Sequence, residues 1–224
     1  MPELKFNFQL QHTDGIARAG ELETLHGKVL TPFFMPVATQ ATVKGLTPEE
    51  VRAVGAQVVL SNAYHLYLRP GVETVVKLGG LHGFMGWDGP ILTDSGGFQA
   101  FSMGPLSKVT DDGIRFRSHI DGSKHNFTPE LATNNQERLA PDIAMCFDQC
   151  IAYGATEKEV LQAMKRTHRW AKQCFDAHQS SPTGLAVGQA LFGIVQGGTF
   201  PELREESAGV ISSIPFHGYA VGGL

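Results

Sequence analysis

The sequence predicts an α/β fold, specifically a (β/α)8 barrel of the TIM type, and three observations favour it. Short apolar runs alternate along the chain with stretches that carry helical signals, as in α/β folds. The runs are apolar at successive positions, which is typical of parallel strands covered by helices on both faces. Polar or glycine residues follow the runs, and such a barrel carries its chemistry at that end of its strands. A doubly wound sheet is the alternative, but no phosphate-binding glycine fingerprint follows the first run.

Six runs are strand candidates. A complete barrel has eight strands and about 250 residues, so about six of the eight strands are expected in these 224 residues. The candidates are residues 33–37, 58–60, 91–93, 143–147, 191–195 and 219–221. We therefore expect one incomplete barrel domain over residues 1–224, with strands 1 to 6 in residues 33–224.

Helix start signals lie between these runs. Two Thr-x-x-Glu sequences have the spacing of a capping box, and two prolines suit the first position of a helix. The boxes are Thr47–Glu50 and Thr156–Glu159, and the prolines are Pro129, after Thr128, and Pro201. The helix that starts at Thr156 is expected to be the longest and to reach about His178.

Two regions interrupt the alternation of strands and helices. Residues 1–32 contain alternating apolar residues and the turn signal Asp14-Gly15, which predicts an N-terminal antiparallel β layer. Residues 114–120 and 124–127 read as a hairpin. We expect this hairpin to be part of an insertion near residues 103–127, between strands 3 and 4.

The composition is that of a globular protein with no basic excess. The chain is 42% hydrophobic and 18% charged, with a net charge of −4. Nucleic-acid binders usually show a basic balance, so the overall charge argues mildly against RNA. No apolar run approaches the length of a membrane span, and the N-terminus does not resemble a signal peptide. We expect a cytoplasmic protein with no membrane partner.

The three cysteines, Cys146, Cys150 and Cys174, form no paired framework, which suggests a reducing compartment. No group of cysteines and histidines has the spacing of zinc ligands. The sequence therefore predicts no metal ligands in this chain.

Two aspartates end strand candidates and are the first candidates for chemistry. Asp94 precedes Gly96-Gly97, and glycines let a backbone approach a flat ligand closely; the alternative is that Asp94 caps the following turn. Asp148 follows an apolar run, where a buried acid needs partners. A carboxylate matches two adjacent N–H donors on a base edge, although a structural aspartate bonded to backbone is equally consistent.

Four further candidate residues also have a simpler structural explanation. Gln196 and the backbone N–H of Gly223 can donate to a carbonyl, but glycine pairs after strands are usually turns. Phe98 can stack on a base, but most phenylalanines are core residues, and Cys150 is more commonly an inert thiol. From residues alone, two acids and an amide fit a glycoside hydrolase as well as a base-exchange enzyme. The basic side of the long helix, formed by Arg166, Arg169 and Lys172, is more typical of a solvated face than of an RNA contact.

Eight segments, in order over nearly the whole chain, resemble tRNA-guanine transglycosylases of the bacterial type, in the N-terminal part of the enzyme. The segments are TPFFMPV at 31–37, ATVKG at 41–45, NAYHL at 62–66 with LRPG at 68–71, TDSGGFQ at 93–99, HIDGSK at 119–124, RTHRWAK at 166–172, QALFGIVQGG at 189–198 and GGL at 222–224. The resemblance implies a (β/α)8 barrel and a pentosyltransferase. Such an enzyme exchanges guanine at the tRNA wobble position for 7-aminomethyl-7-deazaguanine in queuosine biosynthesis, by double displacement.

The resemblance also implies roles for individual residues. Asp94 corresponds to the general acid/base, within the substrate-binding segment of Ser95, Gly96, Gly97 and Phe98, whose aromatic ring stacks on the base. Asp148 corresponds to the acid that reads the guanine N–H edge, and Gln196 and the Gly223 N–H to donors for the base carbonyl. The Leu224 backbone meets the 7-substituent, and Cys150 occupies a position associated with bacterial enzymes.

The chain departs from the family pattern in two places. The family's nucleophilic aspartate and its structural zinc motif lie downstream of the Gly-Gly-Leu sequence that ends this chain. We therefore expect the zinc subdomain and its ligands to be absent, and no turnover by these 224 residues alone. Gln149 stands where the family usually has glutamate.

The expected partners are tRNA with guanine at the wobble position, a deazaguanine base and, in the complete protein, a second copy in a homodimer. An alternative is a non-catalytic partner subunit or base-binding remnant of the same family.

Overall fold

The computed structural model describes residues 5–102, 106–181 and 188–223, and within them shows one parallel and two antiparallel sheets. The chain forms two compact units, each assembled from three segments. Unit 1 comprises Met1–Asp94, Gln136–Ala144 and Ser181–Ala190, and unit 2 comprises Ser95–Asn135, Met145–Ser180 and Leu191–Leu224. Within the described ranges, every helix is too short or too polar to cross a bilayer.

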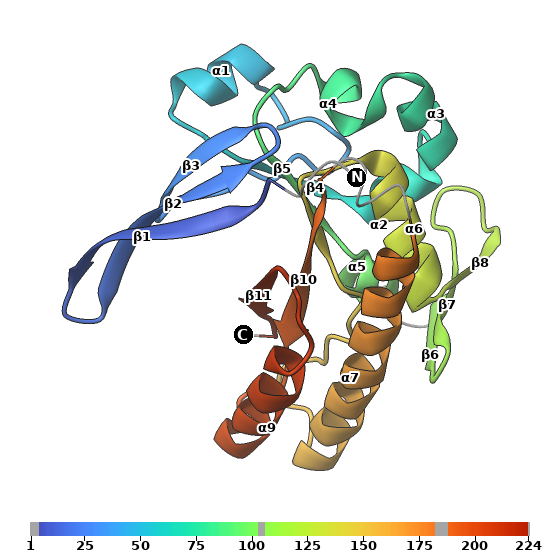
Figure 1. The fold of residues 1–224 in the computed structure, drawn as a ribbon. Coiled ribbons are helices and arrows are strands. Elements are labelled where there is room, and N and C mark those ends of the chain that lie inside the picture. The colour runs from blue at the N-terminus through green and yellow to red at the C-terminus, as the bar shows by residue number, and fades with distance from the viewer. Residues whose placement is uncertain (1–4, 103–105, 182–187, 224) are drawn as a thin grey trace. The chain divides into compact units, whose positions relative to one another are not determined.

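Five of the six strand candidates form the parallel sheet, in the order β11-β10-β9-β5-β4 (Figure 1). In unit 1, β4 pairs with β5 and β5 with β9, and in unit 2 β10 pairs with β11, all in parallel. All three residues of β9 and three of the four in β5 are buried, as expected for covered parallel strands. The bounds are β4 Val59–Asn62, β5 Ile91–Asp94, β9 Ile143–Met145, β10 Ala190–Val195 and β11 Gly218–Val221.

The first strand candidate, residues 33–37, does not form a strand. Val37 forms an isolated bridge to Leu60 of β4, and the Leu60 N–H donates to the Pro36 carbonyl at 3.0 Å. Pro36 has no N–H of its own, and neither has Pro32 just before the segment, so the segment cannot complete a strand ladder. A sixth strand and the closure of a barrel therefore stay predictions.

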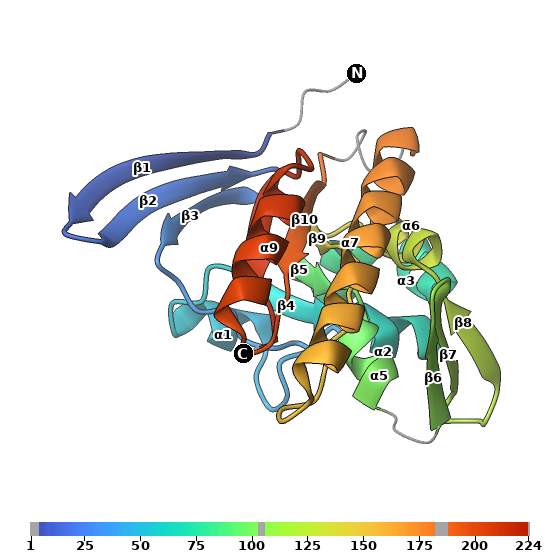
Figure 2. The same ribbon diagram turned by 90° about the horizontal axis from the view of Figure 1, so that it is seen from below.

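The N-terminal residues of unit 1 form an antiparallel sheet in the order β1-β2-β3, as the alternating pattern predicts (Figure 2). Its strands are β1 Asn7–Asp14, β2 Ala17–Thr24 and β3 Gly27–Thr31. β1 is exposed along its whole length, whereas β2 buries Leu22 and Thr24. The turn between β2 and β3 positions His26, which contacts the end of the α6–β9 connection as described below.

Four six-residue helices pack around the core of unit 1: α1 Pro48–Ala53, α2 Ala63–Leu68, α3 Val72–Lys77 and α4 Gly80–Met85. The predicted capping box starts α1, because the Glu50 N–H donates to Thr47 Oγ1 at 3.2 Å and the Thr47 N–H donates to Glu50 Oε2 at 2.7 Å. The sequence does not predict the other three, since fewer than two turns give little periodicity. The core includes Val51, Val59, Leu66, Val75, Leu81 and Ile91.

The longer helices begin at the predicted signals. They are α6 Pro129–Leu139, α7 Glu157–Ser180 and α9 Pro201–Ser212. The short α5 Gly97–Ser102 was not predicted. Thr128 caps α6 by accepting from the Leu131 N–H at 3.2 Å, and Thr156 and Glu159 cap α7 reciprocally. In unit 2, α7 and α9 lie side by side (Figures 1 and 2) and bury Val160, Met164 and Leu203 in one apolar cluster.

The predicted hairpin insertion is a three-stranded antiparallel sheet of unit 2, in the order β6-β7-β8. β7 Gly113–Arg117 and β8 Lys124–Phe127 form the hairpin, and β6 Ser107–Thr110 adds a third strand. β6 was not predicted because its sequence, SKVT, shows little apolar alternation. Residues 103–105 of the expected insertion lie outside the described residues.

Candidate functional site

Asp148 is the centre of a buried polar cluster in unit 2. It follows β9, and only 5% of its surface is exposed. Its Oδ2 accepts from Gln196 Nε2 at 2.7 Å and from the Cys150 thiol at 3.5 Å, and its Oδ1 accepts from Ser95 Oγ at 3.3 Å. Burial of a carboxylate is costly unless its oxygens are hydrogen-bonded, so these three side chains stabilise Asp148 in place.

Glycines allow this cluster to form. A Cβ on Gly97 would lie 2.5 Å from the Asp148 carbonyl oxygen, closer than any real contact. A Cβ on Gly222 would lie 2.7 Å from Gln196 Nε2, and one on Gly223 2.5 Å from Gln196 Oε1. The glycine pairs that follow two of the strands are therefore needed for close approach to Asp148 and Gln196, beyond forming turns.

A cavity of about 320 Å³ in unit 2 is lined by three of the predicted site residues, Phe98, Cys150 and Gly223. Phe98 is 59% exposed, so its ring is available to a ligand and is not part of the core. The other lining residues, which sequence analysis did not single out, are Ile151, Ala152, Tyr153, Gly154, Ala155, Val160, Gly198, Thr199 and Phe200. A flat apolar cavity wall with one buried carboxylate nearby is the usual composition of a small-ligand site.

Arg204 of α9 holds the loops that follow β10 and β11. Its Nη2 donates to the carbonyls of Gly222 and Gly223 at 2.7 and 3.2 Å, and its Nε donates to that of Gly198 at 2.8 Å. Desolvation lowers the pKa of Arg204. No sequence pattern indicates this role, because an arginine in an amphipathic helix is ordinarily a solvated residue.

Asp94 belongs to unit 1, where the end of β4 fixes its carboxylate. Oδ1 accepts from the Ala63 N–H at 2.9 Å, and Oδ2 accepts from Asn62 Nδ2 at 2.5 Å. Asp94 is thus hydrogen-bonded to residues at the end of the neighbouring strand, β4. Asp148 belongs to unit 2, so the shared pocket of Asp94 and Asp148 stays a prediction. Leu224 lies outside the described residues.

Acidic side chains pair with the basic residues of α7, which agrees with the prediction of a solvated helix face. Asp111 Oδ1 pairs with Arg166 Nε at 3.0 Å and with Arg169 Nη2 at 2.9 Å, and Lys172 pairs with Asp176. Arg166 Nη1 also donates to Gln149 Oε1 at 2.5 Å. Gln149 therefore supplies the acceptor that a glutamate would offer, without its charge.

The three thiols do not form a metal site in the described residues. Burial raises the pKa of Cys146 well above its ordinary value and that of Cys174 to about 12, which keeps both thiols protonated. Cys150 is the more exposed thiol, and it donates to Asp148.

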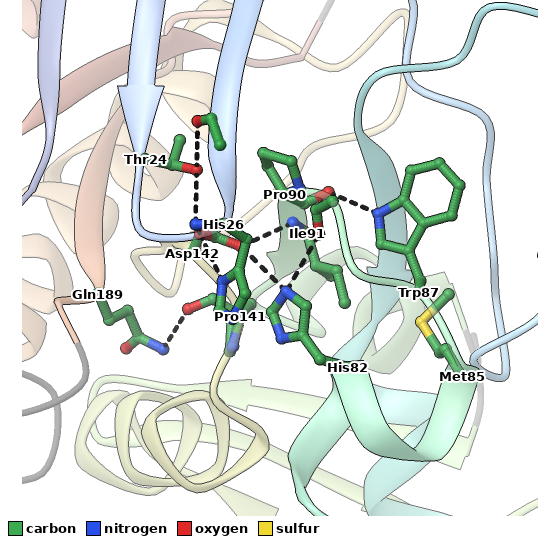
Figure 3. A network of polar contacts seen from close by, with 12 residues as sticks. Thr24, His26, His82, Met85, Trp87, Pro90, Ile91, Pro141, Asp142 and Gln189 are labelled. Atoms are coloured by element: carbon green, nitrogen blue, oxygen red, sulfur yellow. Dashed lines mark hydrogen bonds and ion pairs between the residues drawn. The ribbon is translucent and has the colours of Figure 1, made fainter. Parts of the chain in front are cut away.

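His26, His82 and Asp142 of unit 1 form a second polar cluster, which the sequence did not reveal (Figure 3). Their ligand-type atoms all lie within 4.8 Å of one another. His26 Nδ1 lies 2.9 Å from Asp142 Oδ1, and His82 Nε2 lies 3.2 Å from Asp142 Oδ2. The two imidazole rings stack with their centroids 3.5 Å apart.

The hydrogen bonds of this cluster connect separate segments of unit 1, which indicates a structural role. Each Asp142 oxygen also accepts a backbone N–H, from His26 at 3.1 Å and from Ile91 at 2.9 Å. Carboxylate oxygens only accept, so His26 Nδ1 and His82 Nε2 both carry protons. Asp142 therefore fixes the β2–β3 turn and the start of β5 to each other within unit 1.

Comparison with models of known protein families shows to which family the chain belongs. A model described as Queuine tRNA-ribosyltransferase matches residues 13–224. The chain belongs to the queuine tRNA-ribosyltransferase family. The family match covers both units and every predicted site residue, from Asp94 to Leu224.

Individual relatives of the family agree over nearly the whole chain. Proteins named queuine tRNA-ribosyltransferase are 54% identical in Desulforamulus reducens, 59% in Pelotomaculum thermopropionicum and 55% in Herpetosiphon aurantiacus. The matches cover 99%, 93% and 98% of this chain, and 58%, 55% and 54% of those proteins. The chain thus spans a little over half the length of the relatives it matches.

Proposed function

We propose that the protein exchanges the guanine at the wobble position of tRNA for 7-aminomethyl-7-deazaguanine, as a pentosyltransferase of queuosine biosynthesis. One observation carries the proposal. Asp148, buried between Gln196, Cys150 and Ser95, is the acceptor that a guanine-like base edge requires. Family membership supports the reaction class.

The chemistry of the Asp148 cluster suits a guanine-like base. Guanine presents a ring N–H and an exocyclic amine side by side, and a carboxylate accepts both. Its carbonyl needs a donor, which the Gln196 amide supplies by exchanging its present bond to Asp148 for one to the base, together with the Gly223 N–H. Phe98, exposed on the cavity wall, provides the stacking surface.

Asp94 is proposed as the group that moves protons on the leaving and entering bases. General acid/base catalysis needs a carboxylate held in a fixed position, and Asn62 and Ala63 hold this one. The resemblance implies double displacement, in which an aspartate beyond Leu224 attacks the ribose carbon and the deazaguanine then displaces it. These 224 residues supply base recognition and proton transfer.

Further properties of the whole protein are proposed on the resemblance. They are a closed (β/α)8 barrel, a homodimer and a structural zinc ion. The thiols in the described residues do not fit a Cys-rich zinc site, since Cys146 and Cys174 are buried and protonated; no step is derived through zinc. Cys150, on the cavity wall beside Asp148, is proposed to face the 7-substituent, which would favour the bacterial base.

The test is incorporation of radiolabelled guanine into tRNA by the natural full-length protein. We expect exchange by the wild type, none by Asp94→Ala, and normal exchange by Asp176→Asn, which removes an exposed acid on α7. Unchanged exchange by Asp94→Ala would refute its role. Binding of guanine without any exchange by the wild type would favour the alternative of a non-catalytic subunit.

A further inference from the structure

The outer face of the β6–β8 sheet in unit 2 carries four cations. Lys108, Arg115, Arg117 and Lys124 are all exposed. Lys108 lies directly opposite Arg115, and Arg117 lies directly opposite Lys124. Since side chains alternate between the two faces of a strand, all four project from the face opposite to the buried Ile114 and Phe116.

This arrangement is unfavourable for the sheet by itself. Like charges directly opposite on neighbouring strands are destabilising. Here two such pairs, Lys108–Arg115 and Arg117–Lys124, lie two residues apart along β7. Within the described residues, none of the four cations takes part in a salt bridge. The chain has a net charge of −4, so this concentration of positive charge is local to the sheet.

Two acids in the turns of the sheet, Asp111 and Asp121, already have other partners. Asp111 pairs with Arg166 and Arg169 of α7. The Asp121 carboxylate accepts from the Ser123 hydroxyl at 2.7 Å and the Ser123 N–H at 3.1 Å, and hydrogen bonds, first that from the Ser123 hydroxyl, lower the pKa of Asp121 to about 2. These two acids are therefore not the counterions of the four cations.

The opposite face fixes the sheet firmly to unit 2. Phe116 and Phe127 are buried and contact each other edge to face, and Phe127 continues the contact to Phe147. Trp170 of α7 packs on Phe147 and donates from Nε1 to the Asp111 carbonyl at 2.7 Å. The charged face is thus a rigid platform, which lowers the entropic cost of binding a ligand.

The shape and spacing of the face suit a repeating anion. A shallow hollow of about 380 Å³ is lined by all four cations and by Phe116, His125 and Asn126, among others. Strands lie about 4.8 Å apart and alternate residues about 7 Å apart, so several cations are presented in two dimensions. A single small anion would contact only one of the two cation pairs, whereas a polyanion contacts both.

We propose that this face of the β6–β8 sheet binds the phosphate backbone of an RNA. The inference rests on the proposed function, which names tRNA as the substrate. Arginine and lysine neutralise phosphates and release counterions, which makes such binding strongly salt-dependent. Phosphate contacts position the nucleic acid without reading its sequence, so the sheet orients the RNA while the Asp148 cluster selects the base.

The test measures how tightly the natural full-length protein binds a fluorescent tRNA over a range of salt concentrations. Two charge-removal pairs are compared, Lys108→Gln with Arg115→Gln, and Arg117→Gln with Lys124→Gln. The matched control is Arg18→Gln with Lys77→Gln, which removes two exposed cations of unit 1. We expect each sheet pair to weaken binding and to reduce the slope of log K against log salt by about 1 to 2, and the control pair to change neither.

The outcomes separate this inference from the proposed function. Sheet variants with the affinity and salt slope of the wild type, or loss of affinity equal to that of the control pair, would overturn the inference, whether or not guanine is exchanged. Loss of binding to anionic phospholipid vesicles with unchanged tRNA binding would also overturn it. Absence of exchange by a wild type whose sheet variants lose RNA binding would instead count against the proposed function alone.

Discussion

Gln196 Nε2 lies 2.7 Å from Asp148 Oδ2, and this hydrogen bond within unit 2 joins the residue that follows β10 to the segment that follows β9. The pair presents an acceptor and a donor side by side, which is chemically complementary to the donors and the acceptor of a guanine edge. Each group satisfies the other while the site holds no base, so neither is left buried without a hydrogen bond. The proposed base would supply both partners and so offset the cost of opening this bond.

Asp148→Asn is expected to remove base recognition. An asparagine turns one acceptor into a donor, which then opposes the base N–H and Gln196 Nε2. Hydrogen bonds to charged groups contribute about 1.5–3 kcal/mol, so kcat/KM for guanine should fall about 10- to 100-fold. Base-exchange kinetics measure this. Asp176→Asn on exposed α7 is the control and should behave as the wild type, and equal kinetics in both variants would contradict the role of Asp148.

Gly97→Ala is expected to destabilise unit 2, because the new methyl group would lie 2.5 Å from the Asp148 carbonyl oxygen. Overpacking of this kind costs about 1–3 kcal/mol. Gly209→Ala is the matched control, since a Cβ there meets nothing within 4 Å and replacing glycine in a helix stabilises by about 0.5–1 kcal/mol. Urea unfolding of the two variants should therefore shift in opposite directions; a shift in the same direction would refute the steric argument.

Arg204→Lys is expected to release the loops after β10 and β11. A lysine keeps the charge but lacks the planar fork that reaches several carbonyls at once. Amide hydrogen exchange at residues 222–223 should become faster, and KM for the base should rise more than kcat falls. Arg18→Lys, at an exposed position of β2, controls for the loss of a guanidinium. Unchanged exchange at residues 222–223 would show that the carbonyl contacts of Arg204 do not hold these loops.

Acid is expected to weaken unit 1 through Asp142. Burial alone raises the pKa of Asp142, but the hydrogen bonds from His82, Ile91 and His26 outweigh burial and lower the pKa below its ordinary 3.8. Because the folded-state pKa is the lower one, the stabilisation is complete above the unfolded-state pKa near 3.8 and is lost as pH falls through the folded-state value.

Asp142→Asn tests this pH dependence. The variant should be less stable than the wild type at neutral pH, and the gap in unfolding free energy should narrow below about pH 4. Urea unfolding from pH 7 to pH 3 measures it, with Asp14→Asn at the exposed β1–β2 turn as the control. A gap that stays constant across this range would show that the carboxylate contributes no charge-dependent stability.

Much of the fold was predictable, because long helices and covered strands leave strong local patterns. α7 begins at a capping box and buries one face over many turns, and β9 is apolar at every position. Residues 33–37 share that apolar pattern but form only a bridge. Pro36, and Pro32 just before the segment, lack the backbone N–H donor, which a hydrophobicity pattern does not register.

The candidate site was predictable only in part, for a different reason. Asp148 and Gln196 each end a strand, so their convergence follows from the parallel arrangement. Arg204 acts through backbone carbonyls at the end of β10 and in the loops after β10 and β11, and His26 meets Asp142 across a sequence separation of 116 residues. Contacts of that range depend on the tertiary arrangement and leave no local pattern.

The interleaving of the two units has a consequence for how the chain folds during synthesis. Unit 1 is completed only by Ser181–Ala190, after most of unit 2 has been made, and unit 2 needs residues up to Leu224. Neither unit can complete its fold while the ribosome is still translating the middle of the chain. Both units must therefore close long loops late in synthesis. The edge of β5 that pairs with β9 therefore stays unpaired in the nascent chain until β9 has been made, and unpaired strand edges of this kind are prone to aggregation.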